Sequence, residues 1–200
     1  DSLSVMMNDS QPPQKKQKID DAVSVGSTGA GDEKSHRLSP WLGRWTDKRI
    51  GFHLSDVNEV LKEHVSVLIP PDVVNETDSA EAVCANKRVF VPLCGKTVDM
   101  PFLTSYADEV VGVEGIRLAF EEFIEEHPDL EVKSTGDSDG FEKFVGKGIM
   151  LLKGDYFELD EKKAGGKFSA IYDRASLVAI EPNLRRQYVD IVGNLIAPGG

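Results

Sequence analysis

The sequence predicts an α/β domain built on a doubly wound, parallel sheet. Two observations carry this prediction. Short apolar runs bounded by turn residues recur along the chain, and amphipathic stretches with a period of about 3.6 residues separate them. Strands that alternate with helices in this way form parallel sheets with helices on both faces. The 200 residues, 40% of them hydrophobic and 28% charged, are enough for one such domain.

The first part of the chain differs from the rest in composition. Residues 1–37 are rich in Ser, Asp, Gly, Gln and Lys and hold few large apolar side chains. So little apolar surface cannot offset the entropy of ordering the chain, and we expect a disordered N-terminal tail. The folded domain is expected at 38–200. An amphipathic helix is predicted to begin near Ser55, because apolar residues at 57, 60, 61, 65 and 68 repeat with the helical period.

Four apolar runs are predicted to be buried parallel strands, and they lie at 88–93, 109–114, 149–153 and 168–172. Residues 97–105 suit a short crossover helix between the first two strands. Residues 134–148, rich in Gly and Asp, are predicted to be a loop. Two further helices are indicated by apolar faces, which consist of Ala119, Phe120, Phe123 and Ile124 after the second strand and of Leu184, Tyr188, Ile191, Val192 and Leu195 after the fourth.

Composition and charge exclude several classes of function. The 23 basic and 34 acidic side chains give a net charge of −11, which argues against a surface that neutralises the phosphates of nucleic acid. No apolar run approaches the roughly 20 residues that span a bilayer, and no secretory signal opens the chain. Cys84 and Cys94 are too few for a disulfide framework and do not stand at metal-ligand spacing. We therefore expect a cytoplasmic, monomeric protein without a metal, a nucleic-acid partner or a membrane partner.

The best candidates for ligand binding follow the first two predicted strands, since ligands of doubly wound sheets bind at the carboxyl ends of the strands. Gly95, in the turn at 92–96, lets the backbone approach a ligand closely. Glu114 lies 19 positions later, where a carboxylate can accept hydrogen bonds from ribose hydroxyls. Each feature alone also fits a tight connection or a solvated carboxylate. A pyrophosphate-binding G-x-G-x-x-G array is absent, so the pair favours an adenosyl ligand such as S-adenosylmethionine over a dinucleotide.

Two other groups have both a structural and a functional interpretation. Trp41 and Trp45 share one helical face, which is usual for core residues but also suits a cation such as a sulfonium. The lone His53 is most simply a hydrogen-bonded structural group. Asp173 and Arg174 stand at the end of the fourth predicted strand, where they can form a structural ion pair or act in the pocket.

These segments together resemble the thiopurine S-methyltransferase family, particularly its bacterial-type members. The similarity covers about residues 40–200 in the order of the family. The run from Phe90 to Lys96, Phe-Val-Pro-Leu-Cys-Gly-Lys, is the most specific part, because it replaces the Gly-rich turn of most class I methyltransferases. The matching segments are 41–45, 49–53, 89–96, 111–114 and 172–180.

The resemblance implies a Rossmann-like class I methyltransferase fold, S-adenosylmethionine as cofactor and a small thiol as methyl acceptor. It implies that Arg174 lies beside the methyl-transfer centre, and Asp173 is carried as its catalytic neighbour. Phe52 would also touch the acceptor, while Glu114 would hold the ribose of the cofactor. The cofactor-binding residues implied in this way are Trp41, Trp45, Phe52, Leu93, Gly95, Glu114, Asp155, Tyr156 and Arg174.

The resemblance also leaves alternatives open. In the family a turn such as 197–200 precedes a further strand, so we expect a sheet that is truncated after its fourth strand and the following helix. The acceptor could instead be a halide, selenium or tellurium compound, since soft anions need a similar pocket. A nicotinamide-dependent oxidoreductase would require the absent pyrophosphate array. A non-catalytic domain that retains the fold would bind neither cofactor.

Overall fold

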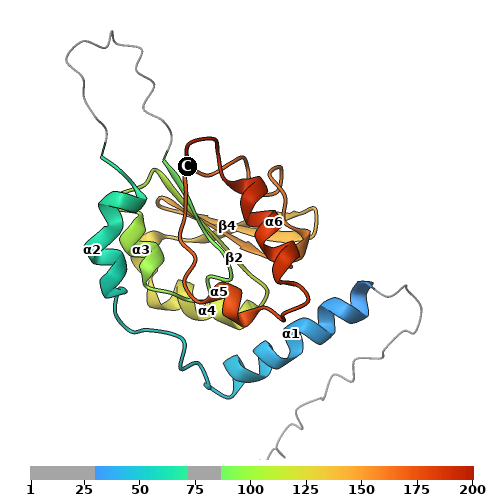
Figure 1. Cartoon of the computed structure of the whole chain (residues 1–200). Coiled ribbons are helices and arrows are strands. Elements are labelled where there is room, and N and C mark those ends of the chain that lie inside the picture. The colour runs from blue at the N-terminus through green and yellow to red at the C-terminus, as the bar shows by residue number, and fades with distance from the viewer. Residues whose placement is uncertain (1–29, 72–86) are drawn as a thin grey trace, which may run out of the picture.

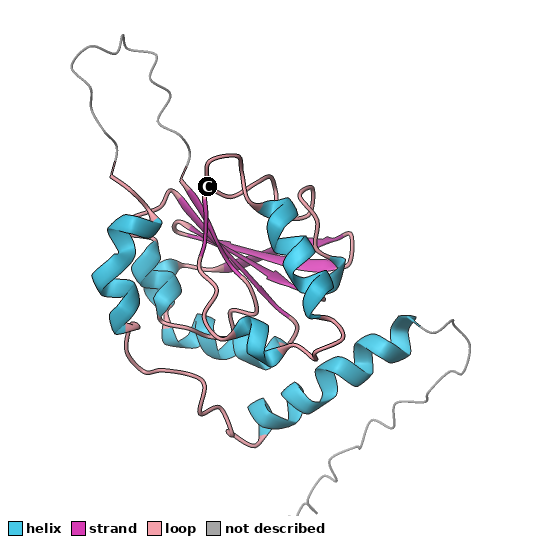
Figure 2. Cartoon of the chain, viewed as in Figure 1, coloured by secondary structure: helices cyan, strands magenta, loops and turns pink. Residues whose placement is uncertain are grey.

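The computed structural model describes residues 30–71 and 87–200, so the expected tail up to residue 29, as well as Cys84, lies outside the described residues. At its centre is a six-stranded sheet with the strand order β3-β4-β5-β2-β1-β6. Figure 1 shows α2 and α3 on one side of this sheet and α6 on the other, and Figure 2 shows the strands enclosed between these helices. The predicted doubly wound α/β architecture is therefore confirmed.

The four predicted parallel strands form the middle and one edge of the sheet. They are β1 (Arg88–Val91), β2 (Glu109–Glu114), β5 (Ile149–Lys153) and β6 (Ala170–Ile171). β1 pairs in parallel with β2 and β6, and β2 pairs in parallel with β5. All four residues of β1 are buried, as expected of a strand covered by helices on both faces. β6 is shorter than predicted, although the amide of Tyr172 still donates to the carbonyl oxygen of Phe90 at 2.8 Å.

The prediction of a loop at 134–148 is wrong. β3 (Lys133–Ser138) and β4 (Phe141–Gly146) form an antiparallel hairpin there, and β4 also pairs antiparallel with β5, so the sheet is mixed. Asp139 and Gly140 both have positive φ angles, of 54° and 83°, which is the backbone that a tight hairpin turn requires. Every residue of β3 is exposed, which explains why its polar composition resembled a loop.

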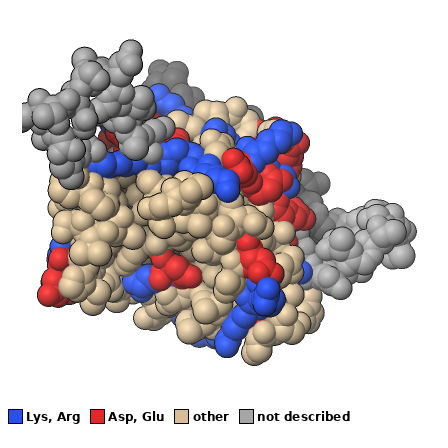
Figure 3. All heavy atoms as spheres, turned by 45° about the horizontal axis from the view of Figure 1, so that its top comes forward, with Lys and Arg blue, Asp and Glu red and all other residues tan. Residues whose placement is uncertain are grey.

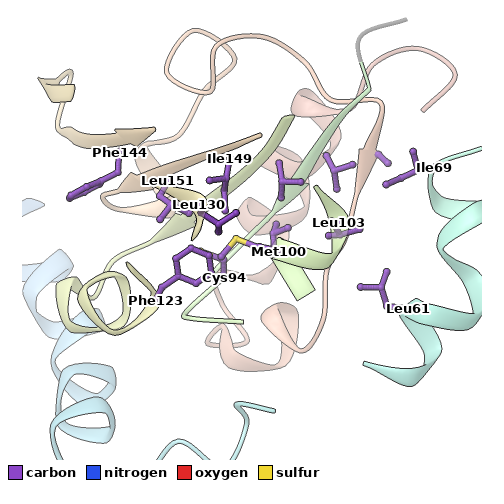
Figure 4. Close-up of a cluster of buried hydrophobic side chains, with 14 of the residues drawn as sticks. Leu61, Ile69, Cys94, Met100, Leu103, Phe123, Leu130, Phe144, Ile149 and Leu151 are labelled. Atoms are coloured by element: carbon purple, nitrogen blue, oxygen red, sulfur yellow. The ribbon is translucent and has the colours of Figure 1, made fainter. Parts of the chain in front are cut away.

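Helices α2 (Glu59–Leu68), α3 (Asp99–Leu103) and α4 (Arg117–Glu126) bury their apolar sides against one face of the sheet. Figure 4 shows part of this core, where Cys94 and Met100 lie close to Phe123. The opposite face is covered mainly by α6 (Arg185–Leu195), whose Tyr188 and Leu195 are fully buried. α2 begins later than the predicted Ser55, because the side chain of Asn58 caps it by accepting from the amide of Leu61 at 3.2 Å.

The largest departure from the predicted domain boundaries is α1 (Ala30–Thr46), which includes the last residues of the expected tail. It lies across the end of the sheet at which β1 and β2 finish (Figure 1). Leu38, Trp41 and Trp45 recur at helical spacing and pack against Ile116 and Ala119 of the α4 region. α1 therefore begins N-terminal to residue 38, and from Leu38 onward these contacts bury one side of it.

The remaining elements are short. They are the 3-10 helices η1 (Pro128–Leu130) and η2 (Tyr156–Glu158) and the single-turn helix α5 (Ser176–Ala179). Within 30–71 and 87–200, none of the helices has the length and hydropathy that a bilayer span requires. On the face shown in Figure 3, basic and acidic side chains adjoin one another beside a wide uncharged area.

Candidate functional site

A pocket of about 340 Å³ lies between the carboxyl ends of the parallel strands and α1. Its walls come from α1, the segment that follows α1, the turn after β1, the ends of β2 and β5, and the residues after β6. This is the place where ligands of doubly wound sheets bind. Its lining includes each of the residues that the sequence predicted to bind a cofactor, namely Trp41, Trp45, Phe52, Leu93, Gly95, Glu114, Asp155, Tyr156 and Arg174.

The turn after β1 is held against the end of β2. Leu93 and Gly95 have φ angles of 44° and 54°, so the chain reverses within a few residues. The carboxylate of Glu114 accepts from the amide of Gly95 at 3.1 Å and from the amide of Ile116 at 2.8 Å, with one oxygen for each. Burial raises the pKa of Glu114, and these amide hydrogen bonds oppose the rise. A carboxylate has about four lone-pair positions, so Glu114 can still accept a hydrogen bond from a ligand hydroxyl.

An aromatic wall faces this turn. Trp41 and Trp45 both meet Phe52 edge to face, with ring centroids 5.8 and 5.9 Å apart. A Cβ atom at Gly95 would lie 3.2 Å from the ring of Trp45, so the glycine gives the indole room to pack on the turn. The three rings therefore line the pocket with π systems, which attract cations.

The end of β5 supplies Asp155 and Tyr156. One oxygen of Asp155 caps η2 by accepting from the amide of Phe157 at 3.0 Å, and the other pairs with Nη2 of Arg37 at 2.5 Å. The guanidinium of Arg37 also lies over the ring of Phe157, 5.1 Å from its centroid. Tyr156 turns its hydroxyl into the core, where it donates to the carbonyl oxygen of Tyr188 at 3.0 Å. Arg37, which was expected to belong to the disordered tail, thus connects α1 to the sheet.

Arg174 and Asp173 do not form an ion pair with each other. Nη1 of Arg174 donates to the carbonyl oxygen of Phe52 at 3.3 Å, and its Nε lies 3.3 Å from Oδ2 of Asp99. Asp173 instead accepts from the amide of Ser176 at 3.1 Å and from the hydroxyl of Tyr188 at 2.8 Å, and it is not part of the pocket lining. The predicted catalytic neighbour of Arg174 therefore anchors α5 to α6.

The pocket also contains three polar residues that the sequence analysis did not assign to ligand binding. Asp99 is almost completely buried at the start of α3. Lys96 makes ion pairs with Glu122 at 3.0 Å and Glu126 at 2.5 Å, so carboxylates already neutralise its charge. His53 lines the pocket, and burial, followed by the charge of Lys96, lowers its pKa. Lys96 and Asp99 could have been found by their position after β1, and His53 by its place in the matched segment 49–53.

Comparison with known proteins places the chain in a family. Residues 36–200 match the family described as Thiopurine S-methyltransferase (TPMT). A curated thiopurine S-methyltransferase from Pseudomonas aeruginosa is 39% identical over 150 residues, which cover 74% of this chain and 61% of that protein. Another, from Nitrosospira multiformis, is 37% identical over 158 residues, which cover 79% of this chain and 64% of that protein. The chain thus spans a little over three fifths of the length of these relatives.

Solved structures agree on the fold. The structure titled "DhpI-SAH complex structure" superposes with a TM-score of 0.51 at 13% identity and covers 86% of this chain and 68% of that one. The "DhpI-SAM-HEP complex" gives a TM-score of 0.50 at 15% identity, covering 87% of this chain and 65% of that one. The sheet order, the pocket at the strand ends and the match over 36–200 all agree with the predicted resemblance. The chain belongs to the thiopurine S-methyltransferase family.

Proposed function

We propose that this chain forms the cofactor-binding part of an S-adenosylmethionine-dependent methyltransferase that methylates the sulfur of a thiopurine or another aromatic or heterocyclic thiol. The observation that carries the proposal is the fixed carboxylate of Glu114, which joins the ends of β1 and β2 opposite an aromatic wall. A ribose needs a hydrogen-bond acceptor and a sulfonium needs π faces, and the pocket offers both within one cavity.

Different residues of the pocket would bind different parts of the two reactants. Glu114 would accept from the ribose hydroxyls, and Asp155 and Tyr156 would lie on the adenine side. The indoles of Trp41 and Trp45 would cover the sulfonium. The bound cofactor supplies an electrophilic methyl group. Arg174, which follows β6, would favour the thiolate form of the acceptor electrostatically.

The absence of a nucleophilic side chain from these roles fits the chemistry. Methyl transfer from a sulfonium to sulfur is an in-line displacement, in which the protein contributes mainly by holding the two reactants in line. An aromatic thiol is already largely ionised near neutral pH, so a Ser-His-Asp or Cys-His arrangement is not required. Cys94 is unsuited to that task, because burial raises its pKa well above the ordinary value.

Calorimetric titration of the chain with S-adenosylhomocysteine tests the cofactor site directly. We expect saturable binding that Glu114→Ala weakens roughly 10- to 100-fold, as for the loss of a hydrogen bond to a charged group. Glu125→Ala, an exposed glutamate on α4, is the matched control and should leave the affinity unchanged. Circular dichroism verifies that each variant is folded. A folded wild-type chain that binds NADH, or that binds neither ligand, would contradict the proposal.

A second candidate acceptor is a soft inorganic anion. Arg174 lines the same pocket, and a cationic group stabilises any anionic nucleophile. Methyl-transfer assays with 6-mercaptopurine, iodide and selenide as competing acceptors separate the two candidates. Turnover of 6-mercaptopurine that iodide and selenide do not suppress favours the thiol, whereas turnover of iodide or selenide alone favours the second candidate.

A further inference from the structure

Asp99, at the start of α3, is the most deeply buried ionisable residue among the pocket-lining side chains, with 1% of its surface exposed. Three segments of the chain meet at its carboxylate. Asp99 accepts from the amide of Asn58 at 2.8 Å through Oδ1, while Oδ2 accepts from the hydroxyls of Thr97 at 3.0 Å and Tyr172 at 3.1 Å. Nε of Arg174 lies 3.3 Å from the same Oδ2.

From this geometry we infer that Asp99 is a positioning residue that aims the guanidinium of Arg174 into the acceptor side of the pocket. Asp99 holds the Nε edge, and the carbonyl oxygen of Phe52 holds Nη1. An arginine that is held at two points of its planar group cannot rotate about its last side-chain bonds. The cation is thereby fixed relative to the aromatic wall, because Phe52 belongs to both.

The buried carboxylate of Asp99 also needs a charged partner and hydrogen-bond donors. An isolated charge in the interior is strongly unfavourable, and one that is paired and hydrogen bonded is tolerated. Arg174 supplies the opposite charge, and the donors from Asn58, Thr97 and Tyr172 fill the remaining acceptor positions. Burial and the neighbouring Asp99 raise the pKa of Tyr172, so its hydroxyl stays protonated and remains a donor. Asp99 therefore serves as a fixed hydrogen-bond acceptor and counterion that orients Arg174.

The inference rests on the proposed function, since Arg174 needs an orientation only if an acceptor meets it. The two can be tested separately, because Asp99 contacts Arg174, which is assigned to the acceptor, whereas Glu114 is assigned to the cofactor. Asp99→Asn keeps the shape of the side chain but removes the charge that pairs with Arg174. Thr97→Val is the matched control, since it removes one neutral hydrogen bond to the same oxygen and leaves the ion pair in place.

The experiment measures two quantities on the full chain. Nuclear magnetic resonance of the arginine Nε–H groups, with Arg174→Gln to assign the signal, reports the hydrogen bonding of Arg174 without any turnover. Asp99→Asn should shift this signal and accelerate its exchange with water at least fivefold, while Thr97→Val should change it much less. Kinetics with 6-mercaptopurine should show kcat/KM reduced about 10- to 100-fold in Asp99→Asn, with the Kd for S-adenosylhomocysteine changed less than threefold.

Combining Asp99→Asn with Arg174→Gln provides the decisive comparison. If Asp99 acts through Arg174, the double variant should be no slower than Arg174→Gln alone, because coupled residues are not additive. Fully additive losses, or an Arg174 Nε–H signal unaffected by Asp99→Asn, would overturn the inference. Should Asp99→Asn be unfolded, Asp99→Ser, which also removes the charge, must perturb the same signal. A wild-type chain without cofactor binding would refute the proposed function, while the Arg174 signal would still decide the role of Asp99.

Discussion

The two sides of the pocket are held in different ways. The sheet side, which comprises the turn at 92–97, Glu114 and Asp155, is connected by main-chain hydrogen bonds. The amide of Cys94 donates to Val113 at 2.9 Å and that of Gly154 to Glu114 at 3.0 Å. The helix side, which comprises α1 and residues 47–58, is attached to the sheet side through side chains, chiefly Trp45 and Arg37.

This difference has a consequence for dynamics. Main-chain pairing in the centre of a sheet breaks only when the domain unfolds, whereas a helix docked by a few side chains can open locally at a lower free energy. The sheet side should therefore be present before any ligand arrives. The helix side should open and close over it.

The largest expected effect is that of Trp45→Ala on the helix side. Trp45 is 2% exposed and contacts both Phe52 and the turn at Gly95. Removing a buried indole costs about 3–5 kcal/mol, and we expect most of this loss in the free energy that docks α1 against the sheet. Amide hydrogen exchange should show protection lost in α1 and retained in β1 and β2. Leu42→Ala, at an exposed position of the same helix, is the control. Equal loss of protection in β2 would show that the two sides unfold together.

The next effect concerns the sheet side. A Cβ atom at Gly154 would lie 2.4 Å from the ring of Phe141, so Gly154→Ala should lower the free energy of global unfolding by about 1–3 kcal/mol. Gly43→Ala is the matched change on the helix side, where nothing lies within 4 Å of the added atom. It should strengthen α1 by up to about 1 kcal/mol. Chemical denaturation measures both, and a reversed order would contradict the assignment of global stability to the sheet.

A smaller effect is expected at the connection between the two sides. Arg37→Ala removes the ion pair with Asp155 and the contact with Phe157, which should weaken docking of α1 by about 1 kcal/mol. Release of bound S-adenosylhomocysteine should then be about fivefold faster in stopped-flow measurements. Arg49→Ala breaks an exposed pair with Asp47 and should leave the rate unchanged. An unchanged rate in Arg37→Ala would mean that α1 does not control release.

The smallest expected effect depends on pH. Burial and then the charge of Lys96 lower the pKa of His53 from its ordinary value of 6.5. The exposed imidazole consequently binds a proton more tightly than the docked one, so docking of residues 47–58 should weaken as the pH falls through 6.5 and stay constant well above it. Hydrogen exchange of this segment between about pH 5 and pH 8 measures the change. His53→Gln should remove this pH dependence, and a pH dependence that persists would assign it to another group.

Much of the fold could be predicted because its signals are local. The apolar runs of β1, β2 and β5 and the faces of α2, α4 and α6 were visible in the order of residues. The sheet then brings together residues that follow different strands, so Gly95, Glu114 and Asp155 could be expected at one edge. The β3–β4 hairpin was not predicted because its outer strand is exposed and polar, whereas strands are recognised in a sequence by their apolar residues.

The order of strands and helices and the kinds of side chain at the strand ends can be read from the sequence, since both are recognised within a few residues. The start of α1 at Ala30, the separation of Asp173 from the pocket that Arg174 lines, and the contact between Asp99 and Arg174 depend on how distant segments pack. Asp173 and Arg174 lie in the connection between β6 and α5, where successive side chains need not share a side, so these adjacent positions take different roles. Contacts between distant segments depend on that packing, which no local pattern specifies.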